Sequence, residues 1–428
     1  MTDYAKVSIN DVKVENVMNG MRGLPAILWE VSQTDENGVR YHGKSLRELE
    51  DLCPKWESSE QVSPEALAWF LYTAEIPTRA QLNNFVADLV RRAELPDDVK
   101  KFCDSIPVEL PPITHMMMSL TVLSRHSKFS AALDSGSVPK TDFWRYAFED
   151  ALDLTARFPM LAARIYSNIY RQGRDRDLLD LTTDLAHNFA MKIGRGSEHD
   201  FIELTRCIWS LHMDHGTNVS AHTVREYLHP FLPSYSTSKR GAGLTSSAWT
   251  DIYMCVAAGM VASMGPLHGR AVTANVEYNI QMSAVLGQEP SDEAIEAFIV
   301  DTIAKGQVVH GYGHALLRGS DPRLQFISRF MKTHEAPKTP RKGSNGGLSL
   351  KLMERAMVII PRLLRLHVPR MKNPAPNMDA LSGCMMLSYG LEADAIVLFA
   401  ACGRGMGVSA QVVWDRGKCF SVGLCRHP

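Results

Sequence analysis

Apolar residues at helical spacing recur along most of this 428-residue chain. Leu161, Ile165 and Ile169 stand four residues apart, which places them on one face of a helix. Comparable patterns occur at 64–73, 80–93, 176–193, 200–213, 291–305, 349–366 and 390–402. The helical pattern over 143–170 should break into two helices at Pro159, because proline lacks a backbone N–H. The chain is therefore expected to be almost entirely α-helical.

One small β-hairpin is expected near the N-terminus. Residues 26–31 and 39–41 are rich in strand-forming side chains and flank Asp35-Glu36-Asn37-Gly38, and Asn-Gly is a typical hairpin turn pair. The segments 233–247 and 337–348 are rich in Ser, Gly, Thr or Pro and are predicted to be loops. No repeat of about 20–50 residues is present, which argues against a helical solenoid.

The charge balance restricts the partners. The chain has 46 Lys plus Arg and 47 Asp plus Glu, a net charge of −1, so we expect neither nucleic acid nor an anionic membrane as a partner. The longest apolar run, 252–264, is shorter than the roughly 20 residues that span a bilayer and predicts a buried helix. The eight cysteines form no C-x-x-C pair, so reduced thiols are expected.

The two ends of the sequence match no targeting signal that we recognise. The first residues have neither the apolar stretch of a secretory signal nor the Arg-rich pattern of a transit peptide. The last four residues, CRHP, match no peroxisomal or prenylation signal. A cytoplasmic location is therefore predicted, with a mitochondrial one as the alternative.

Histidines mark two candidate sites. His212 and His215 follow a predicted helix and could bind zinc with His222, but the spacing matches no strong metal signature, which favours structural or polar-site histidines. His268 lies between Gly265-Pro266 and Gly269. The glycines favour close approach of a ligand, although an isolated histidine could also be a cap or a core group.

A third candidate site is the segment HGYGHALLRGSDPR at 310–323. Its first two glycines resemble a dinucleotide loop only superficially, because the third glycine is misplaced and no strand precedes it. His310, His314, Arg318 and Arg323 could instead receive an anionic substrate, because the arginine fork pairs with carboxylates at two points.

Two further candidates involve single charged residues. Asp379 follows a loop stiffened by two prolines and precedes an apolar helix, so an N-cap is the favoured reading when it is taken alone. Arg404 lies among Gly403, Gly405 and Gly407, which is an unusual setting for a merely solvated arginine. Arg426 is the third residue from the end, where arginines are usually solvated.

Together these segments resemble the citrate synthase family. GPLHG, GYGHALLRGSDPR and KNPAPNMDALSG have the order and spacing of its catalytic motifs, and HMDHGTNVSAHT resembles its oxaloacetate-binding histidine segment. NGMRGL and PKTDFWRYAFEDALDLTARFP resemble the mitochondrial form. The resemblance covers nearly the whole chain. It implies an all-α homodimer, with a large domain over 1–269 and 384–428 and a small domain over 270–383.

The resemblance also implies a role for individual residues. Asp379 would remove a proton from the acyl α-carbon, His268 would hydrogen-bond the thioester oxygen, and His314 would polarise the ketone of oxaloacetate. The residues that would bind oxaloacetate are His215, Asn218, Arg323, Arg404 and, from the other subunit, Arg426. The residues near coenzyme A would be Arg22, Lys140, Val308, Val309, Gly311, Arg318, Arg370, Lys372 and Asn377.

The implied activity is that of an acyltransferase. It would condense an acyl-CoA with oxaloacetate in the cleft between the domains, hydrolyse the citryl-type thioester and release coenzyme A. No cofactor and no metal would be required.

The chain departs from the family's pattern near the acyl end. Ala375 stands where the family usually has Trp, His310 where it has Pro, and Val272 where it has Asn. Loss of a Trp could expose more than about 100 Å² of contact surface. One hypothesis is therefore a donor longer than acetyl-CoA, giving an alkylcitrate of secondary metabolism. Equal weight goes to an ordinary citrate synthase or a 2-methylcitrate synthase that uses propionyl-CoA. A non-catalytic relative is a remote alternative.

Overall fold

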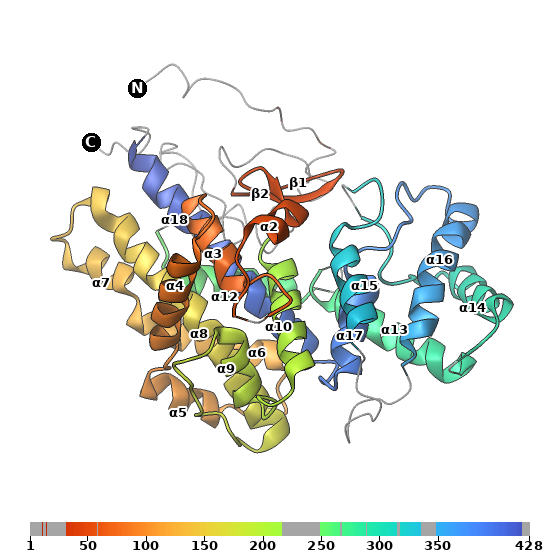
Figure 1. Cartoon of the computed structure of the whole chain (residues 1–428), viewed down its shortest axis with the longest axis horizontal. Helices are drawn as coiled ribbons and strands as arrows, with labels where there is room; N and C mark the ends of the chain where they lie inside the picture. Colours follow the sequence, from red (N-terminus) through yellow and green to blue (C-terminus); the bar gives the residue numbers. More distant parts are fainter. Residues whose placement is uncertain are drawn as a thin grey trace.

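The computed structural model describes residues 31–57, 59–215, 249–265, 268–287, 289–314, 317–334 and 348–421, together with residues 11 and 14. Helices dominate and fall into two groups (Figure 1), which confirms the predicted all-α fold. The first group, on the left, contains α2 (Leu46–Leu52), α3 (Pro64–Thr73), α4 (Arg79–Arg92), α5 (Asp97–Ser105), α6 (Pro112–Leu123), α7 (Lys128–Ser135), α8 (Phe143–Arg171), α9 (Leu185–Lys192), α10 (His199–His212), α12 (Ile252–Ser263) and α18 (Ile396–Ser421). The second group, on the right, contains α13 (Arg270–Leu286), α14 (Asp292–Ala304), α15 (Arg323–Thr333), α16 (Leu350–His367) and α17 (Asp379–Ser388).

The second group comes from one continuous stretch of sequence. Within it α13 packs against α17, and α14 packs against α16. α18 then returns the chain to the first group (Figure 1). Contacts of α15 with α10, and of α13 and α17 with α18, join the two groups. The domain boundaries themselves stay a prediction.

The long helices α8 and α18 pack along each other at the centre of the first group. Because α4, α6, α7, α9 and α12 also pack against α8, almost every residue from Asp150 to Ser167 is buried. This helix is continuous, so the predicted break at Pro159 is wrong. A proline removes one backbone hydrogen bond, and packing on most sides of α8 outweighs that loss.

Side-chain caps define several helix starts. Ser63 accepts a hydrogen bond from the main chain of α3, and Thr78 forms a capping box with Gln81 at the start of α4. The predicted helices at 64–73, 80–93, 200–213, 291–305 and 349–366 are confirmed to within one or two residues. The buried helix predicted at 252–264 is confirmed as α12.

Two predicted helices are shorter or displaced at their starts. The pattern over 176–193 yields only α9. Residues 173–184 form turns and irregular backbone instead, and the side chain of Asn188 in α9 hydrogen-bonds the backbone of Asp180 there. The pattern over 390–402 yields a helix only from Ile396, since Gly390 has a left-handed backbone with φ +85°. The predicted loop at 233–247 and all but the last residue of the one at 337–348 lie outside the described residues.

One helix among the described residues, α18, is long and apolar enough over Ile396–Gly417 to cross a membrane by length and composition alone. However, 78% of this apolar window is buried inside the protein. Such burial is the pattern of an apolar core helix, so α18 gives no reason to expect a membrane-spanning segment.

The predicted hairpin is present as β1 (Ser32–Asp35) and β2 (Gly38–Tyr41), with a short third strand β3 (Lys44–Ser45). β1 and β2 are antiparallel and pair Asp35 with Gly38, so the two-residue loop is Glu36-Asn37. The Asp35 carboxylate accepts hydrogen bonds from the backbone N–H groups of Asn37 and Gly38. The first strand therefore lies later than predicted, and residues 26–30 lie outside the described residues.

Candidate active site

Two loops of the second helix group are joined by backbone hydrogen bonds. The N–H of Gly313 donates to the carbonyl of Ala375 (3.0 Å), and the N–H of Asn377 donates to that of Gly311 (3.0 Å). The Asn377 side chain also donates to the Gly313 carbonyl (2.9 Å). At Gly311 φ is +86°, and a Cβ there would lie 2.7 Å from the Cα of Ala380. This position therefore needs glycine, and the segment 310–323 is held against the segment 372–378.

Two histidines meet at the junction of the helix groups. The rings of His215, just after α10, and His314 have centroids 5.4 Å apart. The backbone N–H of Leu317 donates to Nδ1 of His314 (3.1 Å), which leaves the ring proton on Nε2. Burial lowers the pKa of His314, and burial together with Arg323 and Arg404 lowers that of His215 well below its usual value. Both rings are therefore neutral near pH 7.

Arg323 and Arg404 each lie beside a buried carboxylate. Nε and one terminal nitrogen of Arg323 donate to the two oxygens of Asp321 (3.0 and 2.6 Å), and both side chains are buried. Arg404 lies 3.4 Å from Oδ1 of the fully buried Asp214. Asp321 and Asp214 thus orient the two guanidinium groups, and an arginine fork held in one orientation can pair with a substrate carboxylate.

Three glycines explain how α18 brings Arg404 to this place. A Cβ at Gly403 would lie 2.3 Å from the carbonyl oxygen of Trp209, and one at Gly407 would lie 2.0 Å from that of Met213. A Cβ at Gly405 would lie 2.9 Å from the ring of Phe158 in α8. Gly403 and Gly407 let α18 approach the backbone at the end of α10, and Gly405 leaves room for the Phe158 ring of α8. These contacts account for the glycine-rich setting of Arg404.

Asp379 is the first residue of α17, whereas the cap position is Met378. The favoured reading of Asp379 as an N-cap is therefore wrong. Its N–H donates to the Asn377 side chain (2.9 Å), and no hydrogen bond to its carboxylate is found among the described residues. Burial raises the pKa of Asp379 to about 6, although Arg323 and Arg404 oppose the shift. Such a carboxylate is a stronger base than an exposed one, as a general base requires.

His268 lies between α12 and α13. Its N–H donates to the carbonyl of Gly265 (3.0 Å), and a Cβ at Gly269 would lie 2.4 Å from the carbonyl oxygen of Ser263. The turn is therefore packed tightly against the end of α12. Burial, followed by the charge of Arg404, lowers the pKa of His268 to about 4. His268 is neutral near pH 7 and can act as a hydrogen-bond donor.

The residues predicted near coenzyme A differ in their placement. Arg318 and Lys372 are exposed on the two joined loops, and Arg370 is exposed just before the second one. Val308, which is exposed, and Val309, which is buried, come just before the first loop. Lys140 instead lies just before α8, with its amine 5.6 Å from the centre of the Trp249 ring. No contact between Lys140 and the joined loops is seen among the described residues. Arg22, Asn218 and Arg426 lie outside them.

The three residues predicted to set acyl specificity occupy different surroundings. Val272 is buried between α13 and α17, where a Cβ at Gly383 would lie 2.9 Å from its methyl group. His310 is half-buried, with its ring 6.3 Å from that of Tyr278. Ala375 is half-buried within the joined loops. Only Ala375 and His310 therefore belong to these loops.

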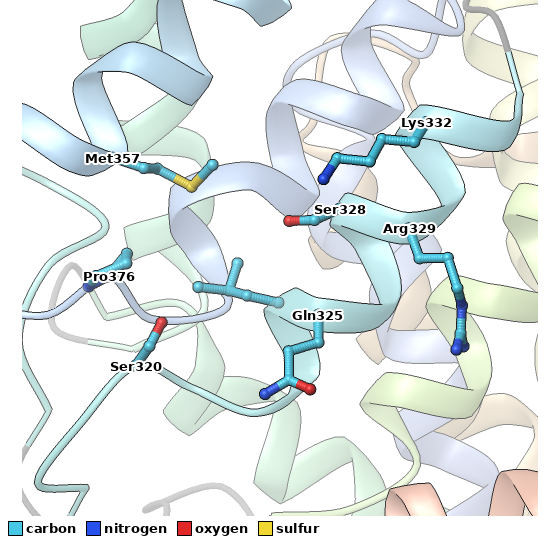
Figure 2. Close-up of a pocket in the computed structure, with 8 residues that line it drawn as sticks. Ser320, Gln325, Ser328, Arg329, Lys332, Met357 and Pro376 are labelled. Atoms are coloured by element: carbon cyan, nitrogen blue, oxygen red, sulfur yellow. The ribbon is translucent and has the colours of Figure 1, made fainter.

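A groove of about 550 Å³ runs along α15 beside the joined loops (Figure 2). Its lining residues are Ser320, Leu324, Gln325, Ser328, Arg329, Lys332, Met357 and Pro376. Leu324 lines the groove, whereas Arg323, the residue before it, pairs with Asp321. The groove therefore lies next to the charged site. Pro376, which follows Ala375 in the sequence, is one of its lining residues.

The histidines and cysteines considered as metal ligands or thiols have the following surroundings. Within the described part of the chain, no three His, Cys, Asp or Glu side chains are grouped so that they could hold a metal ion. Nδ1 of His212 lies 2.8 Å from the Ile208 carbonyl of its own helix, and His222 lies outside the described residues. The six cysteines that the structure describes are buried and free, in agreement with the prediction of reduced thiols.

Sequence comparison places these features in a known family. Residues 20–227 and 235–426 match the family model "Citrate synthase, C-terminal domain". The chain is 36% identical over 424 residues to peroxisomal citrate synthase of Saccharomyces cerevisiae (98% of this chain, 85% of the relative), and 37% identical over 425 residues to mitochondrial citrate synthase of Xiphias gladius (98% and 84%). It is 34% identical over 421 residues to mitochondrial 2-methylcitrate synthase of Fusarium solani (96% and 83%).

The fold agrees with this match. The crystal structure of citrate synthase from Pyrobaculum aerophilum superposes with a TM-score of 0.72 at 18% identity, covering 96% of this chain and 90% of that one. The chain therefore belongs to the citrate synthase family.

The predicted cytoplasmic location is contradicted by these relatives, which are peroxisomal and mitochondrial proteins and point to an organelle. The prediction depended on the lack of a recognisable targeting signal in the terminal residues. Such a lack is weak evidence, because targeting segments are short and variable.

Proposed function

We propose that this protein condenses an acyl-CoA with oxaloacetate, hydrolyses the resulting citryl-type thioester and releases coenzyme A. The observation that carries the proposal is the position of Asp379, which is the half-buried first residue of α17 and lies within the field of Arg323 and Arg404. Burial raises the pKa of its carboxyl group to about 6 there. A base and an anion-binding pair thereby share one site with the neutral rings of His268 and His314.

Oxaloacetate would occupy the side of the site that carries the arginines. Its two carboxylates would be received by Arg323 and Arg404, with His215, Asn218 and the partner's Arg426 completing the pocket as the family resemblance implies. Nε2–H of His314 would donate to the ketone oxygen, since its Nδ1 accepts from Leu317. Polarising this oxygen makes the ketone carbon more electrophilic.

The acyl donor would be activated by a base and a hydrogen-bond donor. The Asp379 carboxylate would remove the α-proton of the thioester while a ring N–H of His268 stabilises the charge that develops on the thioester oxygen. The resulting enol carbon would form a bond to the ketone carbon of oxaloacetate, and the ketone oxygen would become a hydroxyl. Water would then cleave the thioester, with the coenzyme A thiol as leaving group. General-base catalysis is typically worth about 10²–10⁴ in rate.

Coenzyme A would bind across the exposed face of the joined loops. Arg318 and Lys372 are exposed there, Arg370 is exposed just before the second loop, and all three carry the positive charge that its phosphates require. Lys140 and Arg22 would contribute from elsewhere, as the resemblance implies. The proposal includes a homodimer, a large domain of 1–269 plus 384–428, and a small domain of 270–383 that closes over the substrates.

We further propose that the acyl donor is longer than acetyl, so that the product is an alkylcitrate. Ala375 uses its carbonyl to bond Gly313 and its N–H to bond the Asn373 side chain (3.0 Å each), and a methyl group is all that extends from it. The groove that Pro376 lines offers the apolar side chains of Leu324 and Met357 to an alkyl chain, beside its polar and charged lining residues. Burying each CH₂ group contributes about 0.8 kcal/mol to binding.

Two alternatives keep the same site. The 36–37% identity to citrate synthases favours acetyl-CoA as the donor, and the 34% identity to a 2-methylcitrate synthase favours propionyl-CoA. A non-catalytic role is the remote alternative, because a scaffold has no need for His268, His314, Asp379 and the arginines together.

The reaction is tested by mixing the purified protein with acyl-CoA donors, with and without oxaloacetate, and measuring free thiol. We expect thiol release that depends on oxaloacetate and is lost in Asp379→Ala. That variant should still bind oxaloacetate, which calorimetry can check. Absence of release with every donor, from folded wild-type protein, would revive the non-catalytic reading.

A further inference from the structure

The N-terminal hairpin contacts both sides of the charged site through a single short strand. Gly38 at one end of β2 lies against Pro322, since a Cβ there would be 2.8 Å from the proline ring. At the other end the fully buried Tyr41 reaches Asp214. Pro322 directly precedes Arg323, and Asp214 directly precedes His215. The four-residue strand therefore spans the two segments that carry the oxaloacetate-binding side chains.

The Tyr41 hydroxyl makes two hydrogen bonds to one residue. It donates to the carbonyl of Asp214 and accepts from the N–H of the same residue, at 3.1 Å each. Oδ1 of Asp214 in turn accepts from the N–H of His215 (2.7 Å) and lies 3.4 Å from Arg404. One hydroxyl thus fixes the backbone of the residue on which both His215 and Arg404 depend.

Further contacts keep the hairpin in place. The Val31 N–H donates to the side chain of Gln411 in α18 (2.9 Å), which ties the hairpin to the first helix group. The Arg318 N–H donates to the carbonyl of Glu36 at the hairpin turn (3.2 Å), which ties it to the segment after His314. Tyr41 also lies near enough to Arg323 and Arg404 to influence the pKa of both guanidinium groups.

We infer that Tyr41 is a positioning residue of the oxaloacetate site, which acts by fixing the Asp214–His215 segment and through it Arg404. This inference rests on the proposed function, because it concerns the same anion site. Tyr41 need not touch either substrate. Its removal should weaken oxaloacetate binding much more than it alters the acyl-CoA side with Asp379 and His268, because its hydroxyl bonds the backbone of Asp214.

The test compares Tyr41→Phe with Tyr72→Phe. Tyr72 is also buried, and its hydroxyl lies 2.6 Å from that of Ser409 and 3.1 Å from that of Thr155, so both changes remove one bonded hydroxyl. For Tyr41→Phe we expect the Kd and KM for oxaloacetate to rise roughly tenfold, because a backbone donor and acceptor lose their partner. The KM for acyl-CoA and kcat should change less than about threefold. Tyr72→Phe should lower Tm and leave all four constants near the wild type.

The outcomes separate the two proposals. If wild-type protein does not bind oxaloacetate, the proposed function fails and this inference fails with it. If the wild type binds oxaloacetate and Tyr41→Phe binds it equally well, or loses kcat instead, only the role of Tyr41 is refuted. Should Tyr41→Phe not fold, Tyr41→His is measured against the same criterion.

Discussion

Burial sets the protonation of the reacting residues, and it moves acids and bases in opposite directions. It raises the pKa of Asp379 to about 6 and lowers that of His268 to about 4. Both shifts favour the uncharged form, because a charge is costly where water is excluded. The arginines offset part of this cost at Asp379. A basic carboxylate therefore shares the site with neutral imidazole donors.

Replacing Asp379 should separate activity from stability. Asp379→Asn removes the base, so turnover should fall by about 10²–10⁴. The same change removes a carboxylate whose ionisation destabilises the folded state. Its pKa is about 6 in the folded protein and 3.8 in the unfolded chain, so the charged form is favoured by unfolding. At pH 7 we therefore expect the variant to gain about 1–3 kcal/mol in the free energy of unfolding. Urea unfolding of both proteins measures this, and a less stable variant contradicts it.

The pH dependence follows from the same shift. The carboxylate form of Asp379 is the reactive one, so kcat/KM should decrease as the pH falls through about 6 and stay level above it. Stability should change in the opposite sense. The wild type should lose part of its stability as the pH rises from about 4 to 6, and Asp379→Asn should not show this component. A rate profile that is flat between pH 5 and 7 contradicts the assignment of Asp379 as the base.

At the residue scale, the sequence identifies those candidate site residues that stand in a distinctive motif. Asp379, His314 and Arg323 stand in segments whose order and spacing resemble a known family, and the structure brings them to one junction. Tyr41 and Asp214 were not predicted, because their importance depends on a contact across 173 residues of sequence. Asp321 was also missed, although its position two residues before Arg323 was a usable signal.

At the scale of elements, the close approach of α18 to α10 decides where Arg404 lies. Gly407→Ala places a methyl group 2.0 Å from the Met213 carbonyl oxygen, so the helices must separate. We expect a loss of about 1–3 kcal/mol in the free energy of unfolding and weaker oxaloacetate binding.

Gly417→Ala is the matched control in the same helix, since a Cβ there meets no atom within 4 Å. It should gain about 0.5–1 kcal/mol, because alanine favours helix over glycine. Thermal unfolding and calorimetry compare the two variants. Equal stability of both would contradict the close approach of α18.

The errors at the element scale have a common physical cause. Pro159 was predicted to end a helix from local chemistry, but the helices around α8 keep it continuous. The start of α18 was predicted six residues early, because an apolar pattern does not reveal the left-handed backbone of Gly390. Periodicity identifies most helices, whereas tertiary packing and single backbone conformations decide where they end.

At the scale of the whole molecule, the proposed dimer can be tested by mixing two inactive variants. Asp379→Ala lacks the base, and Arg426→Ala lacks the arginine that the partner subunit would supply. In a mixed dimer one site would combine an intact Asp379 with an intact Arg426 from the other chain. We expect activity to return after the two proteins are unfolded and refolded together. If Arg426 acts within its own subunit, neither site is intact and no activity returns.

The most direct test of the central claim is a series of steady-state rates with acetyl-, propionyl-, butyryl-, hexanoyl- and octanoyl-CoA in the presence of oxaloacetate. Ala375→Trp, which restores the larger side chain, is measured beside the wild type. We predict that kcat/KM of the wild type is highest for a donor longer than propionyl, and that the variant loses the long donors at least about tenfold more than acetyl-CoA. A clear wild-type preference for acetyl-CoA would contradict the account.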